Sequence, residues 1–105
     1  MDTNLIYSDH VLTVELCGEV DHHISSGIRE QIDYMLEECN VKTIVFDFSR
    51  VTFMESSGIG IVLGRYNKMA VSGGQVIIRN ARGLVRQILE MSGIFSLMKH
   101  EEDKE

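Results

Sequence analysis

The sequence contains no proline, only two cysteines and no long apolar run. Without proline, no proline-rich linker divides the chain into domains. Cys17 and Cys39 are too far apart for a CxxC motif or a metal-binding spacing, so we expect reduced, mostly buried thiols. No stretch approaches the roughly 18 apolar residues of a membrane span, and the N-terminus lacks the basic residues of a signal peptide. These absences predict a cytoplasmic protein with no membrane partner.

Basic residues are also scarce, since ten lysines and arginines stand against sixteen aspartates and glutamates, for a formal net charge of −6. Because phosphate contacts need clustered Lys and Arg, we expect no nucleic acid as a partner. We interpret the densest basic set, Arg79, Arg82 and Arg86, as a solvated helix face. With 105 residues, of which 44% are apolar and 25% charged, the chain has the composition of one soluble domain with a modest core.

Apolar periodicity predicts alternating strands and helices along most of the chain. Residues 5–7 and 11–16 are expected to form a strand hairpin, with Gly18 ending the second strand and residues 19–23 forming a polar connection. A helix should then run from Ser25 or Ser26 to Cys39. Residues 41–48 predict a strand covered on both faces, residues 57–71 a helix that stops at two glycines, and residues 76–78 a further strand.

The C-terminal part of the pattern predicts a third helix and a tail. Asn80 is expected to be the N-cap of this helix and Gly93 to end it. Residues 94–98 are expected to form a last short strand or a packed turn. We expect disorder from Lys99 onward, and we assign residues 1–100 to the domain and 101–105 to a charged C-terminal tail.

This order of elements predicts a small α/β domain. We expect a mostly parallel, four- to five-stranded sheet with an N-terminal antiparallel strand, packed with three to four helices. The strand at 41–48 should be central. Because right-handed crossovers place the carboxyl ends of parallel strands at one edge, the loop at Asp21 and the segment at Ser56 should lie there together.

A short polar segment, Glu55-Ser56-Ser57-Gly58, precedes the predicted central helix. Serine just ahead of periodic apolar residues is a helix-start signal, because its hydroxyl can accept a bond from a free backbone N–H. One hydroxyl is enough for that purpose. Two consecutive serines therefore leave one that could be presented to something outside the chain.

Enzymatic interpretations of this segment fit poorly. A nucleophile elbow needs glycine two residues before the serine, whereas Met54 precedes Ser56 and Glu55 precedes Ser57 at that spacing. The glycines at 58, 60 and 64 approach a dinucleotide fingerprint, but they begin too far beyond the strand. We interpret Gly60 and Gly64 as sites of close helix packing, and we expect no enzyme and no cofactor. A weak nucleotide-binding domain that uses the helix N-terminus remains an alternative.

His22 and His23 raise the question of a metal site. Adjacent residues cannot easily point at one ion, and no further His or Cys stands at a supporting spacing. We therefore expect no metal, with one histidine packed and the other solvated. Asp21 is a candidate cap for the turn that leads into the first helix.

Two motifs resemble those of a known family. The first motif is Phe53-Met54-Glu55-Ser56-Ser57-Gly58-Ile59-Gly60 with Leu63-Gly64-Arg65-Tyr66, and the second is Gly18-Glu19-Val20-Asp21-His22-His23. Both are similar to the motifs of bacterial anti-sigma factor antagonists of the STAS family. The resemblance extends from Leu5 to His100 and is greatest to members that act in sporulation. It implies a STAS-like domain. One departure is Glu55, where the family commonly has Asp.

The resemblance also implies a function and a site. The unphosphorylated chain would bind an anti-sigma factor, which is a serine kinase holding a nucleotide, and release the sigma factor for transcription. That kinase would phosphorylate Ser56, leaving Ser57 as the helix cap, and a serine phosphatase would reverse the reaction. A STAS module of another partner-switching pathway, such as stress-response sigma regulation, is the alternative. The implied partner-binding residues are Asp21, His22, His23, Glu55, Ser56, Ser57, Gly58, Ile59 and Arg65.

Overall fold

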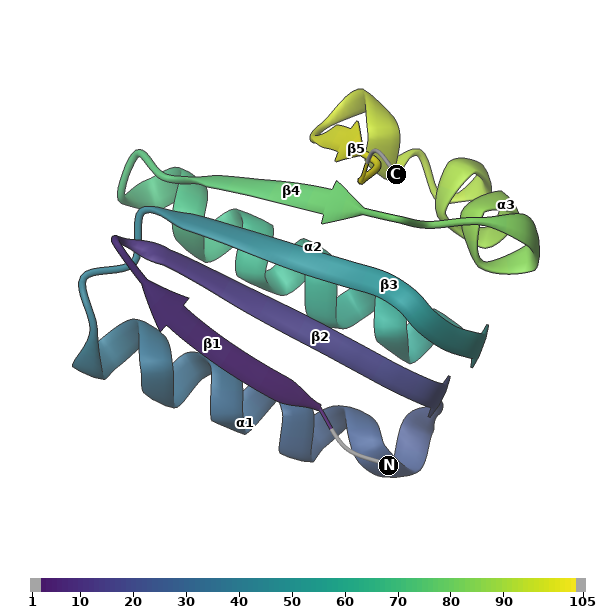
Figure 1. The fold of residues 1–105 in the computed structure, drawn as a ribbon, viewed down its shortest axis with the longest axis horizontal. Helices are drawn as coiled ribbons and strands as arrows, with labels where there is room; N and C mark the ends of the chain where they lie inside the picture. Colours follow the sequence, from purple (N-terminus) through teal and green to yellow (C-terminus); the bar gives the residue numbers. More distant parts are fainter. Residues whose placement is uncertain (1–2, 104–105) are drawn as a thin grey trace.

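A five-stranded sheet with helices α1 and α2 running alongside it dominates the computed structural model, which describes residues 3–103 (Figure 1). The elements in chain order are β1 (Asn4–Ser8), β2 (Val11–Val20), α1 (His22–Glu38), β3 (Thr43–Met54), α2 (Ser56–Val71), β4 (Gln75–Arg79), α3 (Gly83–Met91), the 3-10 turn η1 (Ile94–Ser96) and β5 (Lys99–Glu101).

The sheet has the order β1-β2-β3-β4-β5, with β1 antiparallel to β2 and every other neighbouring pair parallel. This topology confirms the predicted α/β sheet with an N-terminal antiparallel strand and a central third strand. Helices α1 and α2 lie side by side and contact each other, while α3 lies beyond the carboxyl end of β4 (Figure 1). The start of α1 and the start of α2 therefore reach the same edge of the sheet.

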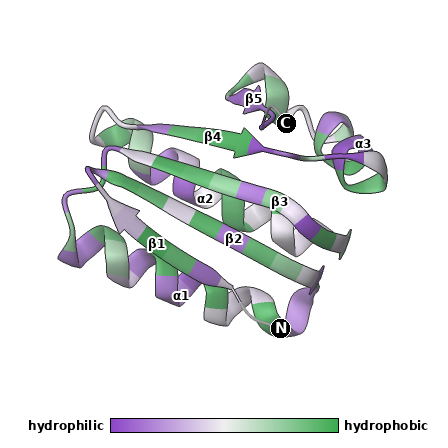
Figure 2. Ribbon diagram, viewed as in Figure 1, coloured by the Kyte–Doolittle hydropathy of each residue, from purple (hydrophilic) through white to green (hydrophobic). Residues whose placement is uncertain are grey.

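The apolar pattern of each element explains this packing. Alternate residues Leu12, Val14 and Leu16 of β2 are buried, as expected of a strand with one face on the core. In β3 the consecutive residues 44–46 are all buried, which confirms a strand covered on both faces. Figure 2 shows hydrophobic colour over much of β2, the first half of β3 and the middle of β4, and hydrophobic and hydrophilic residues alternating along α1.

Strands β2 and β3 extend further than the sequence predicted. Gly18 does not end β2, because the strand accommodates its positive φ of 70° through register shifts on both sides and continues to Val20. Strand β3 likewise runs on from Phe48 to Met54 by pairing with this distal part of β2. The extension carries β2 directly to Asp21 and β3 directly to Glu55 and Ser56.

Asn80 and the C-terminus differ from the prediction. Asn80 does not cap α3: the N-cap is Arg82, and the Asn80 side chain accepts from the Asp103 N–H at 3.0 Å and donates to Asp103 Oδ2 at 3.1 Å. Residues 94–96 form a 3-10 turn, which agrees with the packed-turn alternative. The expectation of disorder from Lys99 onward was wrong for residues 99–103, because β5 pairs with β4 and Asp103 is tied to Asn80. Residues 104–105 lie outside the described residues.

The three arginines of the basic set do not share a helix face. Arg79 ends β4 and Arg82 precedes α3, and only Arg86 lies within the helix. Arg86 bonds Glu90 at 3.1 Å, and its Nη1 lies 3.0 Å from Nδ1 of His100. Burial, followed by the charge of Arg86, holds the pKa of His100 below its ordinary value. The prediction of a solvated helix face was therefore wrong.

Both cysteines are free thiols and half-buried. Among residues 3–103, no helix is long and apolar enough to cross a membrane.

Candidate functional site at the carboxyl edge of the sheet

The carboxyl ends of β2 and β3 bring together the segment that begins at Asp21 and the segment that begins at Glu55. Val20 and Met54 are paired at the ends of the parallel strands, and the Glu55 N–H donates to the Val20 carbonyl at 3.0 Å. Asp21 and Ser56 therefore leave the sheet at the same edge. This confirms the predicted juxtaposition.

Asp21 caps α1, and the helix begins earlier than predicted. Its Oδ1 accepts from the backbone N–H groups of His23 at 3.0 Å and Ile24 at 3.2 Å. The prediction of a polar connection through residue 23 was wrong, because this cap draws His22 and His23 into the first helical turn. Both histidines are exposed and their rings meet edge to face with centroids 6.3 Å apart, so the expectation that one of them packs was wrong too.

Glu55 occupies the N-cap position of α2 but does not cap that helix through its side chain. Its Oε1 instead accepts from the backbone N–H of His22, at 3.1 Å, at the start of α1. No local sequence pattern predicts this contact, because the two residues are 33 positions apart in the chain. The segment of residues 55–58 and the start of α1 are therefore joined directly.

Ser56 and Ser57 have contrasting environments. Ser56 is the first residue of α2 and is exposed at the edge of the sheet. Ser57 is half-buried, and its Oγ is inaccessible and forms no hydrogen bond with any of the described residues. The prediction that Ser57 caps the helix was wrong, because its hydroxyl points inward rather than toward a free N–H. Ser56 thus carries the available hydroxyl of the pair.

Glycine is required at 58 rather than at 60 or 64. A Cβ at Gly58 would stand 2.6 Å from Cγ of Met54 and 3.1 Å from Cγ1 of Val20, so the first turn of α2 sits close against the ends of both strands. At Gly60 and Gly64 a Cβ would meet nothing within 4 Å, and the prediction of close packing there was wrong.

Arg65 does not belong to an exposed face of α2, contrary to the sequence prediction. Its side chain is 7% exposed and its Nε lies 3.1 Å from Oδ1 of Asp33 on α1, while Lys68 reaches the other oxygen at 3.1 Å. Burial lowers the pKa of Arg65, and the charge of Asp33 opposes that effect. Arg65 therefore joins the two helices and is not available to a partner in this conformation. One sequence feature is typical of such a pairing: Arg65 and Lys68 are three residues apart on one helix, so that both can reach the same carboxylate.

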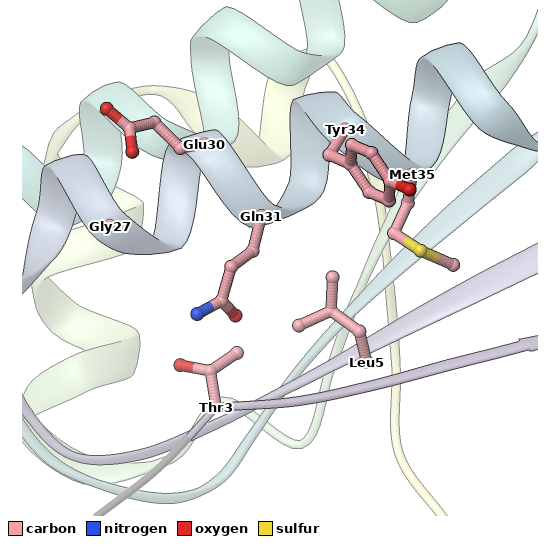
Figure 3. A pocket seen from close by; sticks show the side chains of 7 residues that line it. All are labelled: Thr3, Leu5, Gly27, Glu30, Gln31, Tyr34 and Met35. Atoms are coloured by element: carbon pink, nitrogen blue, oxygen red, sulfur yellow. The ribbon is translucent and has the colours of Figure 1, made fainter.

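Several hollows border α1. A cavity of about 380 Å³ lies between the starts of α1 and α2, where His22, Arg29 and Ser57 are among the lining residues. A larger groove of about 590 Å³ separates α1 from β1, and Figure 3 shows the side chains of Leu5, Gln31 and Met35 projecting into it. The groove contains none of the predicted site residues. Within residues 3–103, no group of three or more His, Cys, Asp or Glu side chains could hold a metal ion.

Comparison with known families and relatives agrees with this geometry. The family model for the STAS domain matches residues 3–105. An anti-sigma F factor antagonist of Paenibacillus polymyxa is 39% identical over 88 residues, which cover 84% of this chain and 75% of the relative. An anti-sigma F factor antagonist of Lysinibacillus sphaericus is 34% identical, covering 79% of this chain and 71% of the relative.

Solved structures agree with the fold. The anti-sigma factor antagonist SpoIIAA in its unphosphorylated form superimposes with a TM-score of 0.88 and 31% identity, covering 99% of this chain and 90% of that one. The Bacillus cell fate determinant SpoIIAA in the phosphorylated form gives a TM-score of 0.80 and 30% identity, with 99% and 93% covered.

Proposed function

Since the chain belongs to the STAS domain family, we propose that it is an anti-sigma factor antagonist: unphosphorylated, it binds an anti-sigma factor and so releases a sigma factor for transcription. The relatives named anti-sigma F factor antagonists support this role, since one is 39% identical over most of both chains. The role requires no catalysis and no cofactor from this chain. Because the partner regulates transcription, we place the function in the cytoplasm.

We further propose that Ser56 is the switch. The anti-sigma factor would be a serine kinase with bound nucleotide that phosphorylates Ser56, and a serine phosphatase would restore the hydroxyl. The observation that carries this assignment is the contrast between the exposed Ser56 and the inward-pointing Ser57 hydroxyl. The similarity to a structure solved in a phosphorylated form is consistent with it.

The proposed partner surface surrounds Ser56. It consists of Asp21, His22 and His23 at the start of α1 together with Glu55, Ser56 and the half-buried Ile59. Gly58 and Arg65 are buried and the Ser57 hydroxyl is inaccessible, so these three residues are not included in it. A phosphate on Ser56 would place about −1.5 to −2 charges at the centre of the surface.

The test is phosphorylation by the cognate kinase with ATP, followed by mass spectrometry. The wild-type chain should gain one phosphate, located on Ser56. Ser56→Ala should remove it, and the matched control Ser57→Ala should keep it. Phosphate on Ser57 in the wild type would contradict the assignment. Binding of nucleotide to the isolated chain, with no kinase affinity, would favour the alternative of a nucleotide-binding domain.

A further inference from the structure

The two helices that meet at the site begin in different ways. At the start of α1 the first three backbone N–H groups all have a carboxylate acceptor: His22 donates to Glu55, and His23 and Ile24 donate to Asp21. At the start of α2 no side chain accepts from the backbone. Glu55 stands at the beginning of α2, yet its carboxylate serves the other helix.

The length of the Glu55 side chain accounts for this choice. Aspartate at an N-cap position accepts from its own helix, as Asp21 does, whereas glutamate is not among the favoured N-cap residues. The additional methylene places the carboxylate about 1.5 Å further out. The Glu55 backbone is meanwhile fixed by its N–H bond to Val20 at 3.0 Å. Glu55 is thus held to the end of β2 by its backbone and to the start of α1 by its side chain.

We propose that Glu55 is a positioning residue, whose hydrogen bond to the His22 N–H holds the start of α1 against the Ser56 turn so that both meet the kinase as one preformed surface. This inference rests on the proposed function, since it concerns the same surface. A surface ordered before binding avoids the loss of conformational freedom that a loose one would suffer on docking. The acceptor oxygen of Glu55, and not its charge, is the feature that matters.

Three substitutions at Glu55 distinguish the effect of its acceptor oxygen from the effect of its negative charge. Glu55→Gln keeps the chain length and the Oε1 acceptor but removes the charge. Glu55→Asp keeps the charge, but its shorter side chain cannot reach His22 and is suited to cap α2 instead. Glu55→Ala removes both features. A matched control is Glu38→Ala, since Glu38 is exposed and lies at the opposite end of α1.

The kinetic readout is phosphorylation of Ser56 by the cognate kinase. We expect Glu55→Asp and Glu55→Ala to raise KM on the order of tenfold, as for the loss of one ordinary hydrogen bond, with kcat nearly unchanged. Glu55→Gln should rescue KM to within about threefold of wild type, and Glu38→Ala should match wild type. The opposite order, in which Glu55→Asp behaves as wild type and Glu55→Gln fails, would overturn the inference in favour of recognition of the charge by the kinase.

A second readout needs no kinase. Amide hydrogen exchange of His22, followed by NMR, should be faster by about tenfold in Glu55→Asp and Glu55→Ala than in the wild type and Glu55→Gln. Unchanged His22 exchange in Glu55→Ala would overturn the inference even if Ser56 is phosphorylated normally. If the wild-type chain shows the His22 protection but is not phosphorylated on Ser56, the proposed function fails while the structural tie stands.

Discussion

Two adjacent serines, Ser56 and Ser57, have different surroundings. Ser56 is exposed, whereas the Ser57 hydroxyl is buried without a hydrogen-bond partner among the described residues. A buried unpaired polar group lowers stability by about 1–3 kcal/mol, so its removal relieves a cost. We therefore expect Ser57→Ala to leave the free energy of unfolding unchanged or to raise it by up to about 1 kcal/mol.

Urea denaturation of Ser57→Ala checks this expectation, with Ser56→Ala as the exposed control. A helix cap at Ser57 would instead make the variant about 1 kcal/mol less stable than wild type. A loss of that size would restore the role that the sequence alone suggested for Ser57.

His100 makes stability depend on pH. The Ala81 N–H donates to its Nε2 at 3.2 Å and Arg86 faces its Nδ1, with Arg82, Glu90 and Glu102 nearby. Because burial and these arginines lower the pKa of His100, the unfolded chain takes up the proton more readily than the folded one. The stability that His100 contributes is present above its unfolded pKa of about 6.5 and is lost as the pH falls toward the lower folded pKa.

Comparing wild type with His100→Gln separates the pH dependence of stability due to His100 from that due to the other histidines. The stability difference between wild type and the variant should be largest near pH 7.5 and should narrow toward about pH 5.5. Denaturation curves at several pH values provide the measurement. A difference that stays constant across this interval would show that His100 does not titrate differently in the folded protein.

At the scale of elements, the pair α1–α2 depends on a largely buried charge. Arg65 on α2 is held by Asp33 on α1, which also binds the exposed Lys68. Breaking a buried pair by removing one partner typically costs 3–5 kcal/mol, whereas exposed pairs contribute about 0–1 kcal/mol. Since Asp33 is partly exposed, we expect Asp33→Ala to cost about 3 kcal/mol and Lys68→Ala at most about 1 kcal/mol.

Equilibrium unfolding in urea measures both variants. Asp33→Ala combined with Arg65→Met should recover much of the lost stability, because the double variant no longer leaves a buried charge without a partner. Equal losses from Asp33→Ala and Lys68→Ala would mean that the burial of Arg65 carries no special cost.

At the scale of the whole molecule, phosphorylation should change binding and not the fold. Near the start of α2 the phosphate is favoured by about 0.3–1 kcal/mol, and the adjacent Glu55 opposes this. At an interface, a desolvated unpaired charge costs about 2–5 kcal/mol, or roughly thirtyfold or more in affinity. We expect the phosphoprotein to bind the ADP-loaded kinase at least about thirtyfold more weakly, with a Tm within a few degrees of the unmodified form.

Calorimetric titration and thermal melting of the two forms test this expectation. Ser56→Asp should reproduce the loss of affinity only in part, because it brings less charge and fewer oxygens than a phosphate. Equal affinities would contradict the switch. A large fall in Tm on phosphorylation would make it an effect on folding instead.

The sequence by itself determined the order of strands and helices as far as α3, and the shared edge of the two motifs. The order of the elements follows from local periodicity, and the shared edge follows from the right-handed chirality that parallel crossovers share in general. The motif around Ser56 also indicated the family, which the match over residues 3–105 shows. The predicted element ends were less accurate, because pairing with a neighbouring strand extended β2 to Val20 and β3 to Met54.

The tertiary structure alone decided which side chains are free and which are engaged. Glu55 turns to His22, Arg65 to Asp33 and Asn80 to Asp103, and each pair joins residues distant in sequence. Such partners are set by strand register and helix packing, which a local pattern does not encode. The same packing turns the Ser57 hydroxyl inward and leaves that of Ser56 exposed, a difference that two identical adjacent residues cannot reveal in sequence.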